Sequence, residues 1–263
     1  MPEIVEVELI RRQLAVLENA HVVSVNTDSN PRFTAAALTI GHSFGLPQRK
    51  GKWLSIPLIN LETGLLSHLG IHLGMTGQLT LLPPAEIPNK WRSRFEFEDG
   101  RVLFHSDLRG FGRVLFLPTP FYGMNLGIEP TDPGFSVALR KLCGNGGSPV
   151  FLSLLRQHLV SGIGSYIAQE SLWRSSISPF RRDLDEESIT ILASSIERVV
   201  HDSLLTGGMT MRDFRHLDGS KGQFFDKLDC YGRNGLPCRR CGYTLQKDRI
   251  GGRGVSSCKF CQN

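Results

Sequence analysis

The chain has 263 residues, and its hydrophobic fraction of 40% and charged fraction of 21% are ordinary values for globular domains. This length allows one large domain or two modest ones, and the sequence lacks the roughly 18 consecutive apolar residues that a membrane helix needs. The formal net charge of +5 is a moderate basic bias that fits a polyanionic partner. The acidic first residues do not resemble a signal peptide, so we expect a soluble intracellular protein without a membrane partner.

The chain begins with MPEIVEVELIRR, which permits two interpretations of Pro2. Removal of Met1 would leave Pro2 with a free secondary amine, and an α-amino group has a pKa of roughly 7.7–8.0. An amine that is partly unprotonated and next to the Glu3 carboxylate could form a Schiff base with a sugar aldehyde carbon. Alternatively, Pro2 begins a helix whose first turn favours the acidic residues Glu3 and Glu6. Taken alone, the segment favours this second interpretation.

The first part of the chain predicts one helix followed by strands. Val7, Ile10, Leu14 and Leu17 recur at helical spacing, which predicts an amphipathic helix over residues 3–18. Short β-prone runs follow from 21 to 117, and Gly, Pro, Asn and Asp separate them as in an antiparallel sandwich or barrel. Asp-Gly in FEFEDGRVLFH predicts a hairpin.

The pattern then changes to a linker and helices. Residues 118–149 are rich in Pro and Gly, whereas FLSLLRQHLV (151–160) has helical spacing and ends at GIG. We expect Ser165 to cap a second helix and Gly207-Gly208 to end a third, over 185–205. The expected boundaries are an N-terminal β domain over 1–128, a linker over 129–148, a helical domain over 149–235 and a C-terminal module over 236–263.

The C-terminal module contains four of the six cysteines, as Cys238-x-x-Cys241 and Cys258-x-x-Cys261 with sixteen residues between the pairs. This spacing is typical of a four-cysteine zinc site, and disulfides are the weaker alternative in a chain without a secretion signal. Because four thiolates leave no coordination position open, we expect one structural zinc ion with no catalytic role. From 236 onward six Lys or Arg residues accompany a single acid, which favours a polyanionic partner here.

Eight segments follow one another from Met1 to Gln262: MPEIVEVE, HLGMTG (72–77), DLRGFG (107–112), LGIEP (126–130), GIGSYIAQESLW (162–173), TMRDF, DCYGRNGLPCRRCG and GGRGVSSCKFCQ. Together they resemble the formamidopyrimidine-DNA glycosylases, which are grouped with endonuclease VIII. The resemblance implies an α+β multidomain fold. It would comprise an N-terminal antiparallel β-sandwich with an N-terminal helix, a helical helix–two-turn–helix domain and a C-terminal four-cysteine zinc finger.

The resemblance also implies catalytic roles at the N-terminus. Pro2 would attack C1′ of a damaged nucleotide and expel the base, and Glu3 would act as general acid and base. The resulting iminium acidifies C2′, so β-elimination and then δ-elimination can cleave the strand. Glu6 would organise the amine, although a carboxylate placed for the helix dipole is an equal alternative. Lys52 would bind a phosphate near the lesion.

Five further residues match DNA-binding positions of the family. Met75, Arg109 and Phe111 would fill the gap that a flipped nucleotide leaves, as a wedge, a guanidinium facing the orphaned base and a stacking ring. Their settings in GMTG and RGFG favour exposed loops. Ser165 at the helix–two-turn–helix and Arg253 in GGRG would each contact a phosphate.

Three departures from the family pattern concern substrate range. Val5 replaces a second proline, and Ser165 stands where the family has asparagine. Phe151-Leu152 occupies a place where many members have Lys-Pro, so a phosphate or lesion contact is expected to be missing.

The resemblance implies a bifunctional DNA glycosylase and abasic-site lyase of base excision repair. It would excise oxidised or ring-opened bases, mainly purines, from duplex DNA. An endonuclease VIII-like enzyme for oxidised pyrimidines or crosslinked bases, and a lesion-binding protein that does not cut, remain the alternatives. We expect a monomer associated with DNA, in the cytoplasm and nucleoid if the source is bacterial.

Overall fold

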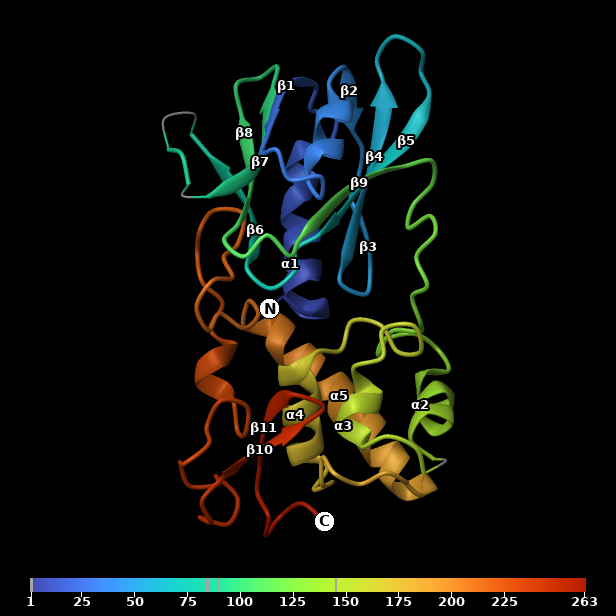
Figure 1. Cartoon of the computed structure of the whole chain (residues 1–263), viewed down its shortest axis with the longest axis vertical. Coiled ribbons are helices and arrows are strands. Elements are labelled where there is room, and N and C mark those ends of the chain that lie inside the picture. Colours follow the sequence, from blue (N-terminus) through green and yellow to red (C-terminus); the bar gives the residue numbers. More distant parts are fainter. Residues whose placement is uncertain (1, 84–85, 89, 145) are drawn as a thin grey trace. The chain divides into compact units, whose positions relative to one another are not determined.

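The computed structural model describes residues 2–83, 86–88, 90–144 and 146–263 (Figure 1). The chain forms two compact units, and both are discontinuous in sequence. Unit 1 combines the chain up to Met124 with the segment Gly207–Gln223, and unit 2 combines Asn125–Thr206 with Phe224–Asn263. The expected boundaries at 128, 148 and 235 leave Gly207–Gln223 within the helical domain, whereas this segment lies in the unit that contains the strands.

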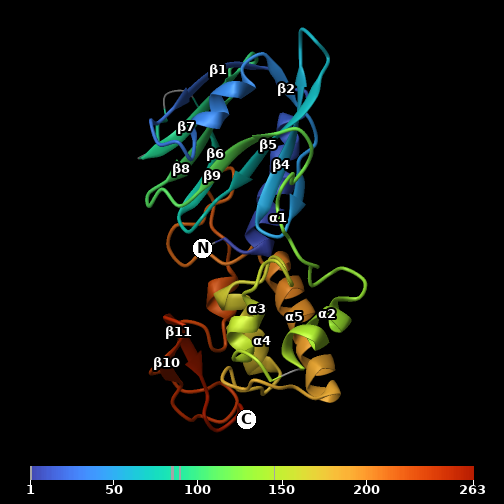
Figure 2. The same cartoon turned by 45° about the vertical axis from the view of Figure 1, so that its right-hand side comes forward.

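Unit 1 is a β-sandwich of two antiparallel sheets (Figure 2). Among the described residues, the four-stranded sheet has the order β1 (Val22–Thr27), β7 (Trp91–Phe97), β8 (Val102–Asp107) and β6 (Gly77–Leu82). The five-stranded sheet has the order β2 (His42–Phe44), β4 (Trp53–Asn60), β5 (Leu66–His72) and β9 (Arg113–Leu117), and β3 (Gln48–Lys50) also pairs with β4.

The hydrophobic pattern of each strand explains how the sheets pack. Leu54, Ile56 and Leu58 alternate along β4, so their side chains share one face and enter the common core. The hairpin predicted at Asp-Gly is confirmed, because β7 and β8 pair antiparallel on either side of Gly100, whose φ is +82°. The predicted sandwich is therefore confirmed. The alternation of apolar and polar residues in the sequence predicted where its strands lie.

Helix α1 (Ile4–Leu14) continues into a short 3-10 helix, Ala15–Leu17, and a second 3-10 helix spans Thr34–Thr39. The residues that predicted the amphipathic helix, Val7, Ile10, Leu14 and Leu17, all lie in the sandwich core. The segment Gly207–Gln223 adds Phe214 and Leu217 to the same core.

Unit 2 contains four α-helices within the described residues: α2 (Phe135–Cys143), α3 (Val150–Leu154), α4 (Ser165–Arg174) and α5 (Glu186–Leu205). Helix α2 lies inside the interval 129–148 that we expect to be a linker. Helix α5 begins after Asp185, whose side chain accepts a hydrogen bond from Ser188 N, and Gly207 follows its end with φ of +73°. No helix in the described part of the chain is long and apolar enough to cross a membrane.

The helix predicted over 151–160 is wrong in its length, because α3 ends at Leu154. Beyond it the backbone turns, and Val160 pairs with Ile128 in an isolated bridge. The Gln157 side chain accepts from Gly162 N at 3.0 Å and donates to Ile163 O at 2.8 Å, which stabilises the turn in place of further helix.

The C-terminal part of unit 2 comprises a 3-10 helix, Phe224–Lys227, and the hairpin β10 (Gln246–Ile250) and β11 (Arg253–Ser257). Trp173 of α4 packs with Cys230, Cys238, Leu245 and Cys258 in a small separate core. This core fixes the cysteine-containing turns against α4.

Candidate functional site

Pro2 and Glu3 are both buried and precede the first turn of α1. The helix begins at Ile4 with Glu3 as its N-cap, so the segment is a helix start, as one of the two interpretations expects, and Pro2 lies just before the cap. Glu3 and Glu6 form a reciprocal capping box, which satisfies backbone amides at the helix start. Glu3 is therefore held in a defined position next to Pro2.

Glu6 links the start of α1 to the segment Gly207–Gln223 within unit 1. Its side chain is only 1% exposed, and its two oxygens accept 2.8 Å hydrogen bonds from Glu3 N and Met209 N. Burial raises the pKa of Glu6 to about 7, with a further contribution from the charge of Glu3. The carboxyl therefore changes protonation near neutral pH while it holds two chain segments together.

Gly208 is required next to Glu6, and the sequence pattern indicated only that it ends a helix. Its φ of +80° lies in the left-handed region, and a Cβ there would come within 3.1 Å of Glu6 Oε1 and 3.0 Å of Leu9 Cδ1. Only the spatial proximity of Gly208 and Glu6 identifies this role.

Lys52 is buried in the turn between β3 and β4, close to a histidine that sequence reasoning missed. Burial, together with the charges of Lys52 and Arg113, lowers the pKa of His72 to about 4. His72 Nδ1 accepts a 3.1 Å hydrogen bond from Gly74 N, as a neutral ring can. The signal available in the sequence was the position of His72 in HLGMTG.

The loops after β5 and β8 are bonded to each other through Thr76 and Asp107. Thr76 Oγ1 donates to Asp107 Oδ1 at 2.5 Å and accepts from Arg109 N at 3.0 Å, while Asp107 Oδ2 accepts from Gly112 N at 2.7 Å. Gly74 permits this contact, because a Cβ at its φ of +62° would lie 2.6 Å from Gly112 N. The two loops thus form one rigid platform.

This platform presents the three residues expected to fill a gap in DNA. Met75 is 39% exposed and Phe111 49% exposed, and Arg109 is also exposed. The Arg109 guanidinium lies 4.7 Å from the centre of the Phe111 ring, in a cation–π contact. Exposed apolar and aromatic side chains on a rigid loop pair are suited to insertion between bases.

In unit 2, Ser165 is the first residue of α4, and Gly164 is its N-cap. The prediction that Ser165 caps the helix is therefore wrong. Gly162 has a φ of +92°, so the chain turns sharply just before the helix, and Gln157 holds that turn. Ser165 nonetheless lies at the helix N-terminus, where backbone amides favour an anion.

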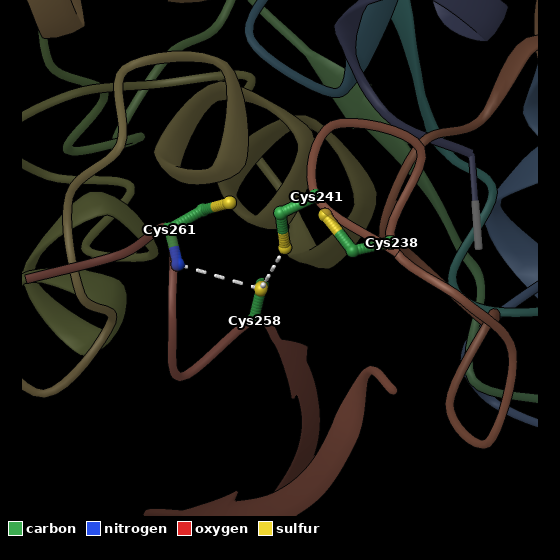
Figure 3. Close-up of side chains that lie close together, drawn as sticks. All are labelled: Cys238, Cys241, Cys258 and Cys261. Atoms are coloured by element: carbon green, nitrogen blue, oxygen red, sulfur yellow. Dashed lines mark hydrogen bonds between the residues drawn. The ribbon is translucent and has the colours of Figure 1, made fainter. Parts of the chain in front are cut away.

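The four cysteines of the C-terminal module lie together (Figure 3). Their sulphur atoms all lie within 4.8 Å of one another, so the cluster could hold a metal ion. Cys241 Sγ and Cys258 Sγ are 3.6 Å apart, far beyond the ~2.05 Å of a disulfide. Trp173 Nε1 donates to Cys238 Sγ at 3.3 Å and Cys261 N to Cys258 Sγ at 3.4 Å, which is how thiolate ligands are commonly supported.

Arg253 is exposed at the start of β11, where it follows the left-handed pair Gly251-Gly252. Phe151, by contrast, is fully buried in α3. Its neighbour Leu152 packs against Gly251, since a Cβ on that glycine would lie 2.8 Å from Leu152 Cδ2. The Phe151-Leu152 pair thus supports the core and the hairpin turn instead of presenting a charge.

Two family models match most of the chain. The formamidopyrimidine-DNA glycosylase N-terminal domain matches residues 1–114, and the formamidopyrimidine-DNA glycosylase H2TH domain matches residues 126–215. A formamidopyrimidine-DNA glycosylase of Thermus thermophilus is 35% identical over all of this chain and 98% of its own length. That of Parasynechococcus marenigrum is 33% identical, with both chains covered in full.

Solved structures agree with these relatives. The MutM (Fpg) protein of Thermus thermophilus superposes with a TM-score of 0.89 at 33% identity, over 99% of this chain and 98% of that one. Lactococcus lactis Fpg in complex with abasic-site DNA gives a TM-score of 0.87 at 28% identity, over 99% of both chains. The same protein with DNA containing N7-benzyl-Fapy-dG gives 0.88 at 29% identity, over 100% of both chains.

Proposed function

Because the chain belongs to the formamidopyrimidine-DNA glycosylase family, we propose that it acts through a Schiff base at Pro2 and then cleaves the DNA strand. It is a DNA glycosylase of base excision repair, and its partner is damaged duplex DNA. The proposed substrates are oxidised or ring-opened bases, mainly purines, and abasic sites. The observation that supports this chemistry best is that Pro2 lies outside α1, beside a Glu3 that is fixed by the capping box.

The proposed reaction begins when the unprotonated amine of Pro2 attacks C1′ of the damaged nucleotide. The C1′–base bond breaks, the base leaves with the electron pair and a proton, and Glu3 exchanges protons with the opening sugar ring. The iminium between Pro2 and C1′ acidifies C2′, so loss of a C2′ proton expels the 3′ phosphate. A second elimination expels the 5′ phosphate, and water then hydrolyses the iminium and regenerates the amine.

Glu6 fits a positioning role in this scheme. It holds Glu3 N at 2.8 Å and places Met209 in the same small region of unit 1. Its raised pKa of about 7 means that the carboxyl can exist uncharged near the attacking amine, so it does not trap that amine permanently as an ammonium ion.

Base removal from a duplex requires the nucleotide to be flipped out, which costs a few kcal/mol of stacking and pairing. We assign the filling of the gap to Met75, Arg109 and Phe111. The bonds through Thr76 and Asp107 fix the two loops before DNA arrives, so little conformational entropy is lost when they insert.

The phosphate contacts and the metal complete the proposal. We assign phosphate binding to Lys52, Ser165 and Arg253, which supply charge or helix amides to the DNA backbone. The metal held by the four cysteines is assigned as one structural zinc ion. Tetrahedral bonds of ~2.3 Å place sulphur atoms about 3.8 Å apart, which fits sulphurs that all lie within 4.8 Å of one another.

Borohydride trapping on a duplex with a single abasic site tests the proposed amine. The wild-type protein should form a covalent adduct, and Pro2→Gly, which replaces the secondary amine with a primary one, should form less of it. A variant with an uncleaved N-terminal extension, in which the Pro2 nitrogen is an amide, should form none. Lys52→Ala serves as the control for a lysine nucleophile and should retain trapping at high protein concentration. An undiminished adduct in the extended variant would contradict the assignment.

A further inference from the structure

One face of helix α4 is devoted to the C-terminal part of unit 2. Tyr166, Gln169, Glu170 and Trp173 follow the i, i+3, i+4, i+7 spacing of a single helix face. Tyr166 packs edge-on against Tyr231, and Trp173 contacts a cysteine of the metal cluster. The two residues between them, Gln169 and Glu170, are polar and only 2% and 0% exposed. Buried polar side chains of this kind need full hydrogen bonding.

Glu170 meets this need by binding three successive backbone amides. Its carboxyl accepts from Asp229 N at 2.9 Å, Cys230 N at 2.9 Å and Tyr231 N at 2.6 Å. Cys230 in turn donates its thiol to Ser256 O on β11 at 3.0 Å. Glu170 thus holds the turn that precedes the cysteine module.

Gln169 binds the hairpin strand itself. Its Oε1 accepts from Ser256 N at 2.7 Å, and its Nε2 lies 3.4 Å from Gly254 O. These two groups belong to residues i and i+2 of β11, on either side of Val255. A side-chain amide that accepts from one and donates to the other reproduces the bonding of an additional strand. Strand β11 is therefore held by β10 on one edge and by Gln169 on the other.

We propose that Gln169 is a positioning residue for Arg253. This role rests on the proposed contact between Arg253 and a DNA phosphate. Arg253 begins the same strand, three residues before Ser256, so about 10 Å of extended chain separates the two. Because Gln169 bonds Ser256 and Gly254 to a helix, the backbone of Arg253 is held in place. The point from which the arginine side chain extends is thus fixed. Helix α4 then carries both proposed phosphate contacts of unit 2, one at its N-terminus and one through Gln169.

A consequence is that the metal alone does not place Arg253. The four cysteines hold the turns at the base of the module, whereas Gln169 acts on the strand that leads to the arginine. Loss of the Gln169 bonds should therefore leave the metal bound and the unit folded while DNA affinity falls.

A double-mutant cycle on the full-length, metal-loaded protein tests this. The probe is a duplex containing a tetrahydrofuran abasic-site analogue, which cannot be cleaved as a sugar aldehyde, and the readout is Kd at several salt concentrations. Arg253→Ala should weaken binding about tenfold, as loss of one charge-assisted hydrogen bond does, and lower the salt slope by about 0.9. Gln169→Leu should cause most of the same loss and the same change in slope. The double variant should bind no more weakly than Arg253→Ala.

Two further variants separate positioning from general destabilisation. Gln169→Met keeps an unbranched side chain and should reproduce the loss if Gln169→Leu fails to fold. Gln246→Leu makes the same change at an exposed position of β10 and should leave Kd unchanged. Metal content should stay at one equivalent in every variant.

Additive losses in the cycle, or loss of metal from both Gln169 variants, would overturn the positioning role and leave the proposed function intact. If Arg253→Ala binds as tightly as the wild type, the phosphate contact and the positioning role are both wrong. A wild-type protein that does not prefer the abasic analogue to undamaged DNA would instead count against the proposed function itself.

Discussion

Replacing Glu6 with glutamine should change how the stability of the protein depends on pH. The Glu6 carboxyl is 1% exposed, and burial raises its pKa from 4.5 to about 7. Between these two values the folded protein keeps a proton that the unfolded chain releases. The stability associated with this proton is fully present below pH 4.5 and is lost as the pH rises through about 7.

The size of the effect follows from the same interval. Each pH unit between 4.5 and about 7 corresponds to ~1.36 kcal/mol. The free energy of unfolding should therefore fall by ~3 kcal/mol across this pH interval. Glutamine stays uncharged at every pH, so the stability of the variant should not change through this interval. Its side chain offers one acceptor oxygen where Glu6 uses two, for Glu3 N and Met209 N, so the variant should be about 1 kcal/mol less stable than the wild type near pH 5. Between pH 5 and pH 8 the difference should shift by about 2–3 kcal/mol in favour of the variant. Catalysis should suffer, because one of the two amides loses its acceptor.

Urea unfolding measured from pH 5 to pH 8.5 checks this, with Glu8→Gln as the matched control on the same helix. Although burial raises the pKa of Glu8, hydrogen bonds from Arg11, Arg12 and Arg49 hold it at about 2. The stability that Glu8 contributes is thus lost only as the pH falls below 4.5 toward 2, so Glu8→Gln should differ from the wild type by a constant amount in this window. Parallel curves for the wild type and Glu6→Gln would refute the reasoning.

Three other outcomes can be measured directly. Cys258→Ser should remove the bound metal, detected by metal analysis, and weaken DNA binding while the circular dichroism of the strands persists; a full equivalent of retained metal would contradict the four-cysteine site. Gly74→Ala places a Cβ 2.6 Å from Gly112 N and should disturb the two loops. Single-turnover excision of a damaged base should fall at least tenfold, at about 1.4 kcal/mol per factor of ten, whereas abasic-site cleavage should slow much less. Equal losses in the two reactions would exclude a role of these loops in flipping. Because Phe151 is buried and supplies no charge, poorly stacked ring-opened purines and abasic sites should be processed faster than 8-oxoguanine on matched duplexes; equal single-turnover rates would show that another residue compensates.

Local patterns in the sequence predicted much of the fold. Alternation along β4 and the Asp-Gly turn before Arg101 specify strands and a hairpin within a few residues, and both are confirmed. The end of α3 was missed because it depends on Gln157, which bonds the backbone of Gly162 and Ile163. Side-chain to backbone bonds of this kind leave no periodic signal.

The candidate site was likewise predicted only where the sequence carries a local pattern or a family motif. The cysteine spacing predicted a metal site from sequence alone, and the resemblance to a family supplied Pro2, Met75 and Arg253, whose roles stay predictions. Neither source indicated that Thr76 binds Asp107, because these residues belong to different loops and become neighbours only in the sandwich. Contacts between distant segments require the fold to be known.

The return of Gly207–Gln223 to unit 1 also constrains the order in which the protein can be made. The ribosome releases the nine strands seen in the described part of the sandwich before it releases Phe214 and Leu217, yet both side chains belong to the sandwich core. Until they emerge, Leu81 N lacks the carbonyl of Leu217 that it binds at 2.8 Å in the finished unit. The nascent sandwich must therefore wait, with part of its core uncovered, while most of the helical segment is synthesised. A gene fragment that stops at Met124 would encode these nine strands of unit 1 and still lack the residues that close its core.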